Sequence, residues 1–564
     1  MMCAALYRQS TAHAPRHLRG NCLRADNWDN ARRERCCPMS RVGVWIIGDQ
    51  VCRQASSLAG VDRQTPIVFV ESRDFCLRRP YHWQKLVLIF SAMRHHAREL
   101  QNAGRPVHYF HGAADFASAL RQFVAGTGID TLRVMEPNDP GRLGPPGEME
   151  RLIGCRVEVT PNNQFLCDDP WFDQWAQRRS TLVMEHFYRE MRRMLDVLLD
   201  RDGQPLGGQW NLDKLNRRSS IPADLPIPEP FAVAPDAITC QAIDDVHAWF
   251  GDRCFGATSP AQMRQLFTWP VTPADADAAL DDFLQRRLAN FGPYEDAMTG
   301  RSWSLWHSHL SVPMNCGLLH PRDIVERTLA YALPRVKRGS LPLNSVEGFI
   351  RQVIGWREYM RHVYRREAAR NDAAPYAQRN ALHADHPLPD FYWTGQTDMA
   401  CVRDCLRPVI ERGYCHHIPR LMVLANFALL HGISPQQVNE WFIYAYADGY
   451  EWITTPNVIG MGLYADGGIV ATKPYAAGGA YINRMSDYCR TCRYRPDQAT
   501  GPDACPFTRA YWPFVHRHQR MLATNPRTSL MVRSLSRLSA SELTARQQQS
   551  RAWLQSIETY RPSG

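Results

Sequence analysis

The chain has no apolar run near the roughly 18–20 residues that a membrane-spanning helix needs. Its longest candidates, Val42–Ile47 and Ile418–Leu430, are too short or are interrupted by polar residues. Hydrophobic residues make up 45% and charged residues 22%, which is the balance of a soluble globular protein. We therefore expect a cytoplasmic monomer without a membrane partner.

The first forty residues lack the apolar core of a secretory signal. They carry seven Arg and few acidic residues, so an Arg-rich organellar targeting peptide stays open as an alternative. Met39 stands just before the first strand-like run. We expect residues 1–40 to be a disordered or mis-started extension.

Seventeen cysteines without an export signal indicate a reducing compartment, where thiols serve as ligands or core residues instead of disulfides. The formal net charge is +10, which is mild for 564 residues. A basic balance is compatible with a polyanionic partner but does not establish one.

From Arg41 onward, short apolar runs alternate with amphipathic stretches. This alternation predicts a doubly wound parallel sheet in an α/β domain over residues 41–165. No Gly-x-Gly-x-x-Gly follows the first run, so a standard dinucleotide site is not supported. The predicted strands are Val42–Ile47, Ile67–Val70, Val107–Phe110, Thr131–Val134 and Val157–Val159, and the predicted helices are Trp83–Ala103 and Phe116–Ala125.

The rest of the chain divides into three regions that differ in composition and periodicity. Residues 166–275 are predicted to be an interdomain linker with one strong helix, Thr181–Leu199, and a Pro- and Gly-rich loop, Gly203–Pro235. Residues 276–525 have helical periodicity throughout. Residues 526–564 are expected to be a C-terminal tail with one helix, Ala540–Ile557. The helices predicted in the all-α region are Ala278–Asn290, Pro321–Leu333, Ser345–Glu367, Val402–Arg412, Pro419–His431 and Ser434–Ala447.

The strongest local signal is Cys489-Arg-Thr-Cys492, followed after twelve residues by Cys505-Pro506. Two thiolates separated by two residues can bind one metal centre, and a Cys followed by Pro recurs in iron–sulfur proteins. Zinc with His516 or His518 as the fourth ligand is the alternative. The spacing alone divides nearly evenly between zinc and iron–sulfur, and three unligated cysteines are the third option.

Three further motifs combine charge with aromatic residues. They are Trp356-Arg357-Glu358-Tyr359 on a helix, Tyr414-Cys-His416-His417 with Arg420 after it, and the segment from Asp448 to Lys473-Pro-Tyr475. Taken singly, each has a purely structural explanation: a core Trp, a paired Arg, or a surface His pair. Their occurrence together, in this order along the chain, is harder to explain by structure alone.

Together these residues resemble the photolyase/cryptochrome superfamily, and more narrowly its prokaryotic iron–sulfur group of (6-4) photolyases and cryptochromes. The resemblance covers about residues 41–525. It implies an α/β Rossmann-like N-terminal domain and an all-α C-terminal FAD-binding domain. The other motifs that carry it are Phe90-Ser-Ala-Met-Arg94-His95, Met184-Glu-His-Phe-Tyr188-Arg-Glu-Met-Arg192, Gly207-Gly-Gln-Trp210-Asn211, Asn-Val-Ile-Gly-Met at 457–461 and Tyr488-Cys-Arg-Thr-Cys492.

The resemblance implies two cofactors in the helical domain. A [4Fe-4S] cluster would be held by Cys401, Cys489, Cys492 and Cys505, with Cys405 as a substitute for Cys401. FAD would be bound by a phosphate-binding segment, by Arg357, and by an ion pair of Arg420 and Asp448 against the flavin ring. The residues that match the phosphate-binding segment are Tyr294, Ser308, His309, Leu310 and Ser311.

The implied activity is light-dependent repair of UV-damaged DNA. A (6-4) photolyase reverses pyrimidine (6-4) photoproducts by electron transfer from excited reduced FAD to a flipped-out lesion. His417 matches the proton donor to the lesion, with His416 as its structural neighbour. Trp393 and Trp441 match electron-relay positions, unless they are simply core residues. The basic loop Asn211–Arg218 matches one that approaches DNA.

The chain departs from the group's pattern at three places. Thr454 stands beside the flavin position where an acidic residue is expected, and Phe442 replaces a relay tyrosine. Asp74-Phe75-Cys76 stands where a Glu holds the antenna 6,7-dimethyl-8-ribityllumazine. Two alternative functions stay open: a blue-light photoreceptor cryptochrome, and a non-photochemical nucleic-acid-binding metalloprotein.

Overall fold

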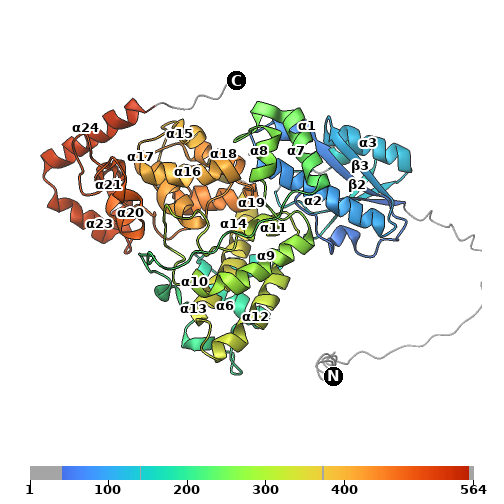
Figure 1. The fold of residues 1–564 in the computed structure, drawn as a ribbon, viewed down its shortest axis with the longest axis horizontal. Helices are drawn as coiled ribbons and strands as arrows, with labels where there is room; N and C mark the ends of the chain where they lie inside the picture. Colours follow the sequence, from blue (N-terminus) through green and yellow to red (C-terminus); the bar gives the residue numbers. More distant parts are fainter. Residues whose placement is uncertain (1–40, 140, 146, 371–373, 558–564) are drawn as a thin grey trace, which may run out of the picture. The chain divides into compact units, whose positions relative to one another are not determined.

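The computed structural model describes residues 41–139, 141–145, 147–370 and 374–557. The expectation for residues 1–40 lies outside the described residues. The chain from Arg41 onward forms one compact unit, which begins with the sheet and continues into the helices (Figure 1).

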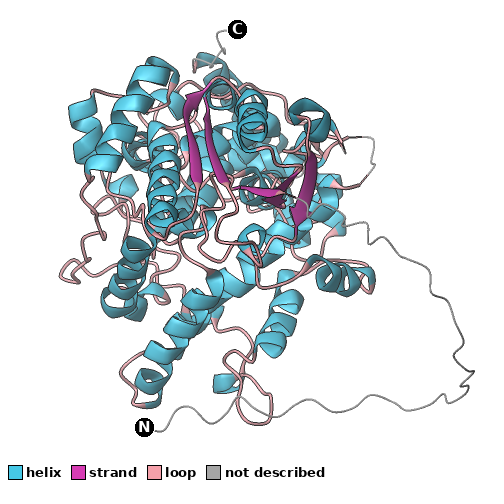
Figure 2. Ribbon diagram, turned by 90° about the vertical axis from the view of Figure 1, so that its right-hand side faces the viewer, coloured by secondary structure: helices cyan, strands magenta, loops and turns pink. Residues whose placement is uncertain are grey.

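The sheet has five parallel strands in the order β3-β2-β1-β4-β5, drawn in magenta in Figure 2. All five predicted strands are present, with ends shifted by one to three residues. The predicted fold class is confirmed. The strands are β1 (Val42–Trp45), β2 (Ile67–Ser72), β3 (Val107–Ala113), β4 (Thr131–Met135) and β5 (Arg156–Thr160).

Both faces of the sheet are buried, because successive strand residues point to opposite sides. Val44 and Phe69 belong to the large core that includes α2 (Trp83–Asn102). Trp45 and Val68 belong to a smaller core with α3 (Phe116–Thr127). Helices on both faces of a parallel sheet explain why the central strands read as continuous apolar runs.

The region after the sheet is more helical than predicted. The expected helix Thr181–Leu199 is shorter, α6 (Met184–Leu195), and ends at Asp196 with a left-handed backbone. Three helices were missed: α5 (Asp169–Gln177), α7 (Ala237–Phe250) and α8 (Pro260–Leu266). The α7 helix packs on α2 of the α/β region, and its contacts there outweigh its weak sequence pattern.

The loop Gly203–Pro235 was predicted without regular structure, and it holds only two short 3-10 turns, Leu206–Gly208 and Asp213–Leu215. Asp213, Lys214 and Arg217 of this loop lie at the edge of a large cavity described below.

The remaining chain forms the helical region. The predicted helices are present, but three are divided. Ala278–Asn290 is divided into α9 (Pro273–Arg286) and α10 (Leu288–Phe291), and π-helical segments divide Ser345–Glu367 and Pro419–His431. No helix in the described part of the chain is both long and apolar enough to cross a membrane. The other main helices are α11 (Ser311–Asn315), α12 (Pro321–Lys337), α13 (Leu343–Ile350), α14 (Glu358–Ala368), α15 (Phe391–Thr394), α16 (Ala400–Arg412), α17 (Asn426–His431), α18 (Pro435–Ala445), α19 (Glu451–Thr455), α20 (Gly479–Met485) and α21 (Pro506–Arg517).

The predicted C-terminal helix is present as α24 (Ala540–Ser556), which begins with a capping box between Ser539 and Glu542. It packs along α21, and the Trp553 ring lies 5.4 Å from the ring of His431. The described part of the tail is therefore attached to the helical region.

Candidate functional site

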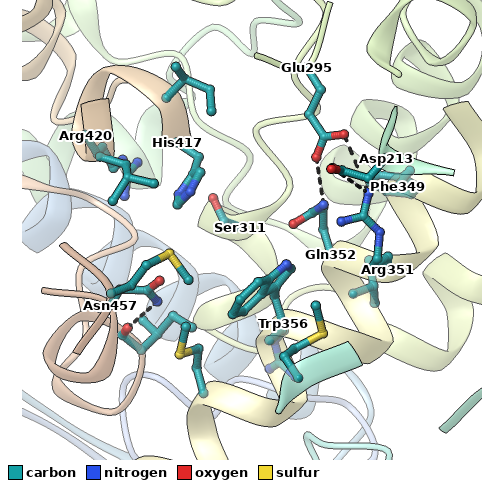
Figure 3. Close-up of a pocket in the computed structure, with 18 of the residues that line it drawn as sticks. Asp213, Glu295, Ser311, Phe349, Arg351, Gln352, Trp356, His417, Arg420 and Asn457 are labelled. Carbon is teal, nitrogen blue, oxygen red and sulfur yellow. Dashed lines mark hydrogen bonds and ion pairs between the residues drawn. The ribbon is translucent and has the colours of Figure 1, made fainter. Parts of the chain in front are cut away.

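A cavity of about 1070 Å³ opens among the helices. This is at or above the upper end of the range for ligand pockets, so it has room for a dinucleotide-sized ligand. Its walls come from α6, the loop around Asp213, α11, the helix that carries Trp356, and the segments around His417 and Asn457. Figure 3 shows these walls converging on one space.

Three π-helical segments line this cavity: η5 (Arg351–Arg357), η7 (Pro419–Ala425) and η8 (Pro456–Gly462). The first joins α13 to α14, the second runs into α17, and the third follows α19 and ends that helical stretch. A π-bulge adds a residue to a turn and redirects the side chains around it, which is why such bulges concentrate at functional sites. The sequence predicted helices at the first two segments but not their widened turns, and it predicted no helix at the third.

Arg420 and Asp448 form the predicted ion pair on one wall. The guanidinium makes two parallel bonds to the carboxylate, at 3.0 and 3.1 Å. The Ser311 hydroxyl donates to the same carboxylate at 2.7 Å. Arg420 lies over the Tyr446 ring at 4.1 Å, and the nearby Asp448 charge raises its pKa despite burial. The pair is held as a rigid, charged surface beside the cavity.

His417 opens into the cavity, whereas His416 is buried behind it. The His416 ring stacks on that of His307 at 4.1 Å. The protein atoms packed around the imidazole, and then the Arg420 charge, lower the pKa of His417 to about 4, although the side chain is exposed to the cavity. Burial also moves the pKa of His416 well below its usual value. Both imidazoles are therefore neutral near pH 7 in the ligand-free protein.

The predicted phosphate-binding residues are only partly brought together. Ser308, Leu310 and Ser311 line the cavity. His309 does not line it, and its ring stacks on Trp303 at 4.9 Å. Tyr294 also lies outside the lining, stacked on Trp306 at 4.8 Å.

Arg357 and Thr454, both predicted to bind the flavin, line the cavity. Arg357 donates to the carboxylate of Glu358 at 3.1 Å, and burial lowers its pKa to about 10. Its Nε has no hydrogen-bond partner among the described residues. A buried donor without a partner is costly, so this atom fits a ligand with acceptor oxygens.

The wall opposite His417 was not predicted. The Gln352 amide donates to Glu295 at 2.8 Å, and Arg351 bonds to Asp213 at 3.4 Å (Figure 3). Burial raises the pKa of Glu295 to about 7. Gln352 lies four residues before the Trp356-Arg357-Glu358-Tyr359 motif noted in the sequence, but no sequence pattern showed that the π-turn places its side chain at the cavity.

The two predicted relay residues lie behind the cavity. Trp441 is fully buried and donates to the Tyr392 carbonyl at 3.0 Å. Its ring is 4.9 Å from Phe442, which lines the cavity. Trp393 is half-buried on α15 and packs edge-on against Phe255 at 5.3 Å. An aromatic row from α15 to the cavity therefore runs through Tyr392, Trp441 and Phe442.

The four cysteines predicted to hold the cluster come from segments that are far apart in the sequence and lie near one another in the structure. Cys401 lies on α16, Cys489 lies in the 3-10 turn Tyr488–Arg490 with Cys492 just after it, and Cys505 caps α21. Burial, and then the thiols of Cys505, Cys405, Cys492 and Cys489, raise the pKa of Cys401 well above its usual value. For Cys405 the contributing thiol is Cys415, so Cys401 is the member that faces the other three.

The histidines considered for zinc lie elsewhere. His516 and His518 are at the far end of α21 from Cys505, roughly 16 and 20 Å along the helix axis at 1.5 Å per residue. His516 bonds to Gln547 at 3.1 Å. Within the described residues no three His, Cys, Asp or Glu side chains are placed to hold a single metal ion.

Phe75 lies in an aromatic group on the α/β side. Its ring is 5.6 Å from Phe116 and 6.5 Å from Tyr81, and the Arg142 guanidinium lies 5.0 Å over it. Asp74 bonds to Arg78 on the surface at 2.6 Å. The position expected to hold an antenna is thus packed with this chain's own side chains.

Comparisons with known proteins agree with this architecture. The family described as "Deoxyribodipyrimidine photo-lyase-related protein" matches residues 44–262. A (6-4) photolyase of Agrobacterium fabrum is 42% identical over 503 residues, which are 88% of this chain and 96% of that protein. The crystal structure of a class III photolyase from Agrobacterium tumefaciens matches with a TM-score of 0.52 at 16% identity, covering 93% of this chain and 100% of that chain.

A parallel sheet followed by a largely helical region is the fold that this chain shares with the class III photolyase structure. The identity over most of both chains makes the assignment specific: the chain belongs to the photolyase/cryptochrome superfamily. The family predicted from the motifs is confirmed.

Proposed function

We propose that this protein is a DNA photolyase that reverses pyrimidine (6-4) photoproducts with blue light. The observation that carries the proposal is the shared cavity of His417 and the Arg420–Asp448 pair. A fixed charge pair and an accessible imidazole face one space that has room for a dinucleotide-sized ligand. The (6-4) photolyase with 42% identity supports the same lesion class.

FAD fits the cavity. Ser308 and Ser311 offer hydroxyls, Arg357 offers an unpaired donor, and the Arg420–Asp448 pair would lie against the ring system. Reduced FAD, when bound and excited by blue light, supplies an electron to the lesion. The protein's own residues position the flavin and the lesion, exclude water and transfer the proton.

His417 is the group that handles the proton. Its pKa of about 4 leaves it neutral before the lesion binds. Negative charge beside an imidazole raises its pKa, so the phosphates and the reduced lesion favour its protonated form. A proton acquired in this way is donated to the lesion and regained after repair. His416, stacked behind on His307, holds the backbone position of His417.

The four cysteines fit a [4Fe-4S] cluster better than zinc. Zinc needs its ligands about 2.3 Å from one ion, and no such group is present among the described side chains. A four-iron cluster is larger and holds its thiolates farther apart. Cys401, Cys489, Cys492 and Cys505 influence one another electrostatically.

The residues around Phe75 do not fit the lumazine antenna. The carboxylate expected there is replaced by a phenyl ring packed among Phe116, Tyr81 and Arg142. No part of the proposed activity passes through an antenna.

The test follows repair of a single (6-4) lesion in an oligonucleotide under blue light, with the protein reduced anaerobically. Wild type is expected to restore the lesion, and His417→Ala to be slower by about 10²–10⁴-fold, the usual contribution of a positioned acid. In the same preparations, bound iron should be lost in Cys401→Ser and kept in the matched control Cys405→Ser, four residues away on α16.

The alternatives give different results. Flavin and iron without light-dependent repair would favour a photoreceptor cryptochrome, whereas repair of a cyclobutane dimer only would change the lesion class. Equal iron in both Cys variants would contradict the ligand set. A protein that binds DNA but carries no flavin would be the non-photochemical metalloprotein.

A further inference from the structure

An apolar side chain stands exposed at the edge of the cavity. Leu215 is 62% exposed, one of the most exposed large hydrophobic residues among those described. It ends the 3-10 turn Asp213–Leu215. Its neighbours Asp213, Lys214 and Arg217 line the cavity, whereas Leu215 points outward from the same turn.

The turn is anchored on both sides of Leu215. Before it, the buried Leu212 donates its backbone N–H to the Glu347 carboxylate at 3.0 Å. After it, Asn216 is 1% exposed, donates to Glu295 at 3.1 Å and accepts from Asn344 at 2.7 Å. Because both anchors are buried, Leu215 cannot fold back into the core, and its exposure is imposed by the structure.

Charge surrounds this apolar tip. Lys214, Arg217 and Arg218 are exposed within three residues of Leu215. Arg217 pairs with Asp213, which also bonds to Arg351 of the cavity wall. A tip that is apolar at its end and basic around it matches a duplex, whose phosphates lie outside a stack of apolar base faces.

We propose that Leu215 inserts into the DNA duplex and fills the gap left when the damaged pyrimidines enter the cavity. The inference rests on the proposed function. Flipping bases out leaves neighbouring base pairs unstacked, and apolar residues such as Leu are inserted between base steps by proteins that distort DNA. Lys214 and Arg218 then contact the phosphates on either side of the gap.

The chain offers a matched control. A single exposed Leu is ordinary on a protein surface, and Leu530 is one, 67% exposed on α23 (Ser529–Arg533). Leu215 differs from Leu530 because it stands on a turn whose neighbouring residues Asp213, Lys214 and Arg217 line the cavity.

The test measures dissociation constants in the dark at one salt concentration. The probes are a duplex with one (6-4) lesion, the undamaged duplex, and the damaged strand alone. Leu215→Ala is expected to weaken binding to the damaged duplex about tenfold or more, the value of burying a Leu side chain. Its affinity for the damaged single strand should be unchanged, because a single strand has no gap to fill. Leu215→Met and Leu530→Ala should match wild type on all probes.

Three outcomes overturn the inference. If Leu215→Ala binds the damaged duplex like wild type, the insertion is wrong while the repair function stands. If Leu215→Ala loses affinity by the same factor for the damaged duplex and for the single strand, the side chain acts as a general contact and is not inserted between the bases. If wild type does not prefer the damaged duplex to the undamaged one, the proposed function and the insertion fall together.

Discussion

The carboxyl ends of the sheet strands and the cavity of the helical region both bury charged side chains, but they satisfy them differently. At the sheet, β1 lies between β2 and β4, so connections leave it in opposite directions and create the crevice where α/β proteins bind ligands. Asp139 accepts there from the Trp452 backbone at 2.9 Å and pairs with Arg142 at 3.3 Å.

Lys85 completes this network at the sheet. It donates to the Ile443 carbonyl at 3.2 Å and lies between the rings of Tyr81 and Tyr450, at 4.8 and 4.7 Å. Burial lowers its pKa to about 7. Its carbonyl partners and Tyr450 come from the helical region, so the charges at this crevice connect the two parts of the chain. Gln50 Oε1, just after β1, is the kind of neutral acceptor that stays without a hydrogen-bond partner among the described residues there.

In the cavity, by contrast, donors remain open. Arg357 Nε lacks a partner among the described residues, and His417 is accessible. Buried charge at the sheet is thus structural, and buried charge in the cavity is available to a ligand. Similar residue types have different roles, and the difference depends on which contacts the fold supplies.

The largest effect is expected from breaking the Arg420–Asp448 pair of the cavity wall. Arg420→Met leaves the Asp448 carboxylate buried with Ser311 as its remaining side-chain partner. Losing one member of such a pair costs about 3–5 kcal/mol of unfolding free energy. Urea unfolding measures it, and bound flavin should be lost. Arg420→Lys keeps the charge and should retain part of the stability and part of the bound flavin. If wild type and Arg420→Met were equally stable, the ion pair would not contribute to stability and the expectation would be wrong.

The second expectation compares two histidines whose pKa burial lowers to about 4, His82 between the sheet and helical regions and His417 in the cavity. A folded pKa below the unfolded value of about 6.5 means that stability is lost as pH falls from 6.5 towards 4. Damaged DNA should raise the pKa of His417 only, because His82 is bonded to the Ile410 carbonyl at 2.9 Å.

Deuterium exchange at the histidine C2 positions, followed by mass spectrometry with and without DNA, reads both pKa values. Undamaged DNA of the same length is the control. If damaged DNA shifted the pKa values of His82 and His417 by the same amount, the contrast between the closed site at the sheet and the open cavity would be wrong.

The smallest effect is expected at the sheet. Phe75→Ala removes a half-buried ring and should cost about 1–2 kcal/mol, less than the loss of a fully buried Phe. Flavin content should not change, since Phe75 lies outside the cavity. The purified wild type should show no lumazine absorption, and added ribityllumazine should not bind. Stoichiometric lumazine would show that Phe75 and its neighbours leave room for an antenna.

Much of the fold could be predicted from the sequence. The strands were found because apolar runs such as Ile67–Val70 are buried on both faces, and the helices of the cavity because their periodicity is long. The α7 helix was missed because its stability comes from packing on α2. The cavity residues Glu295 and Gln352 were missed because a π-turn, which has no simple sequence pattern, directs the glutamine towards the carboxylate.

The sequence by itself determined the order of sheet and helices and the spacing of Cys489, Cys492 and Cys505, because periodicity and spacing are local properties. The family resemblance added Cys401 and the role expected of His417. The tertiary structure decided which of Cys401 and Cys405 faces the other thiols, and that Tyr294 and His309 lie behind the cavity instead of in it. It also decided that Leu215 is held exposed beside the cavity. These outcomes depend on contacts between segments far apart in the chain, and local patterns carry no record of them.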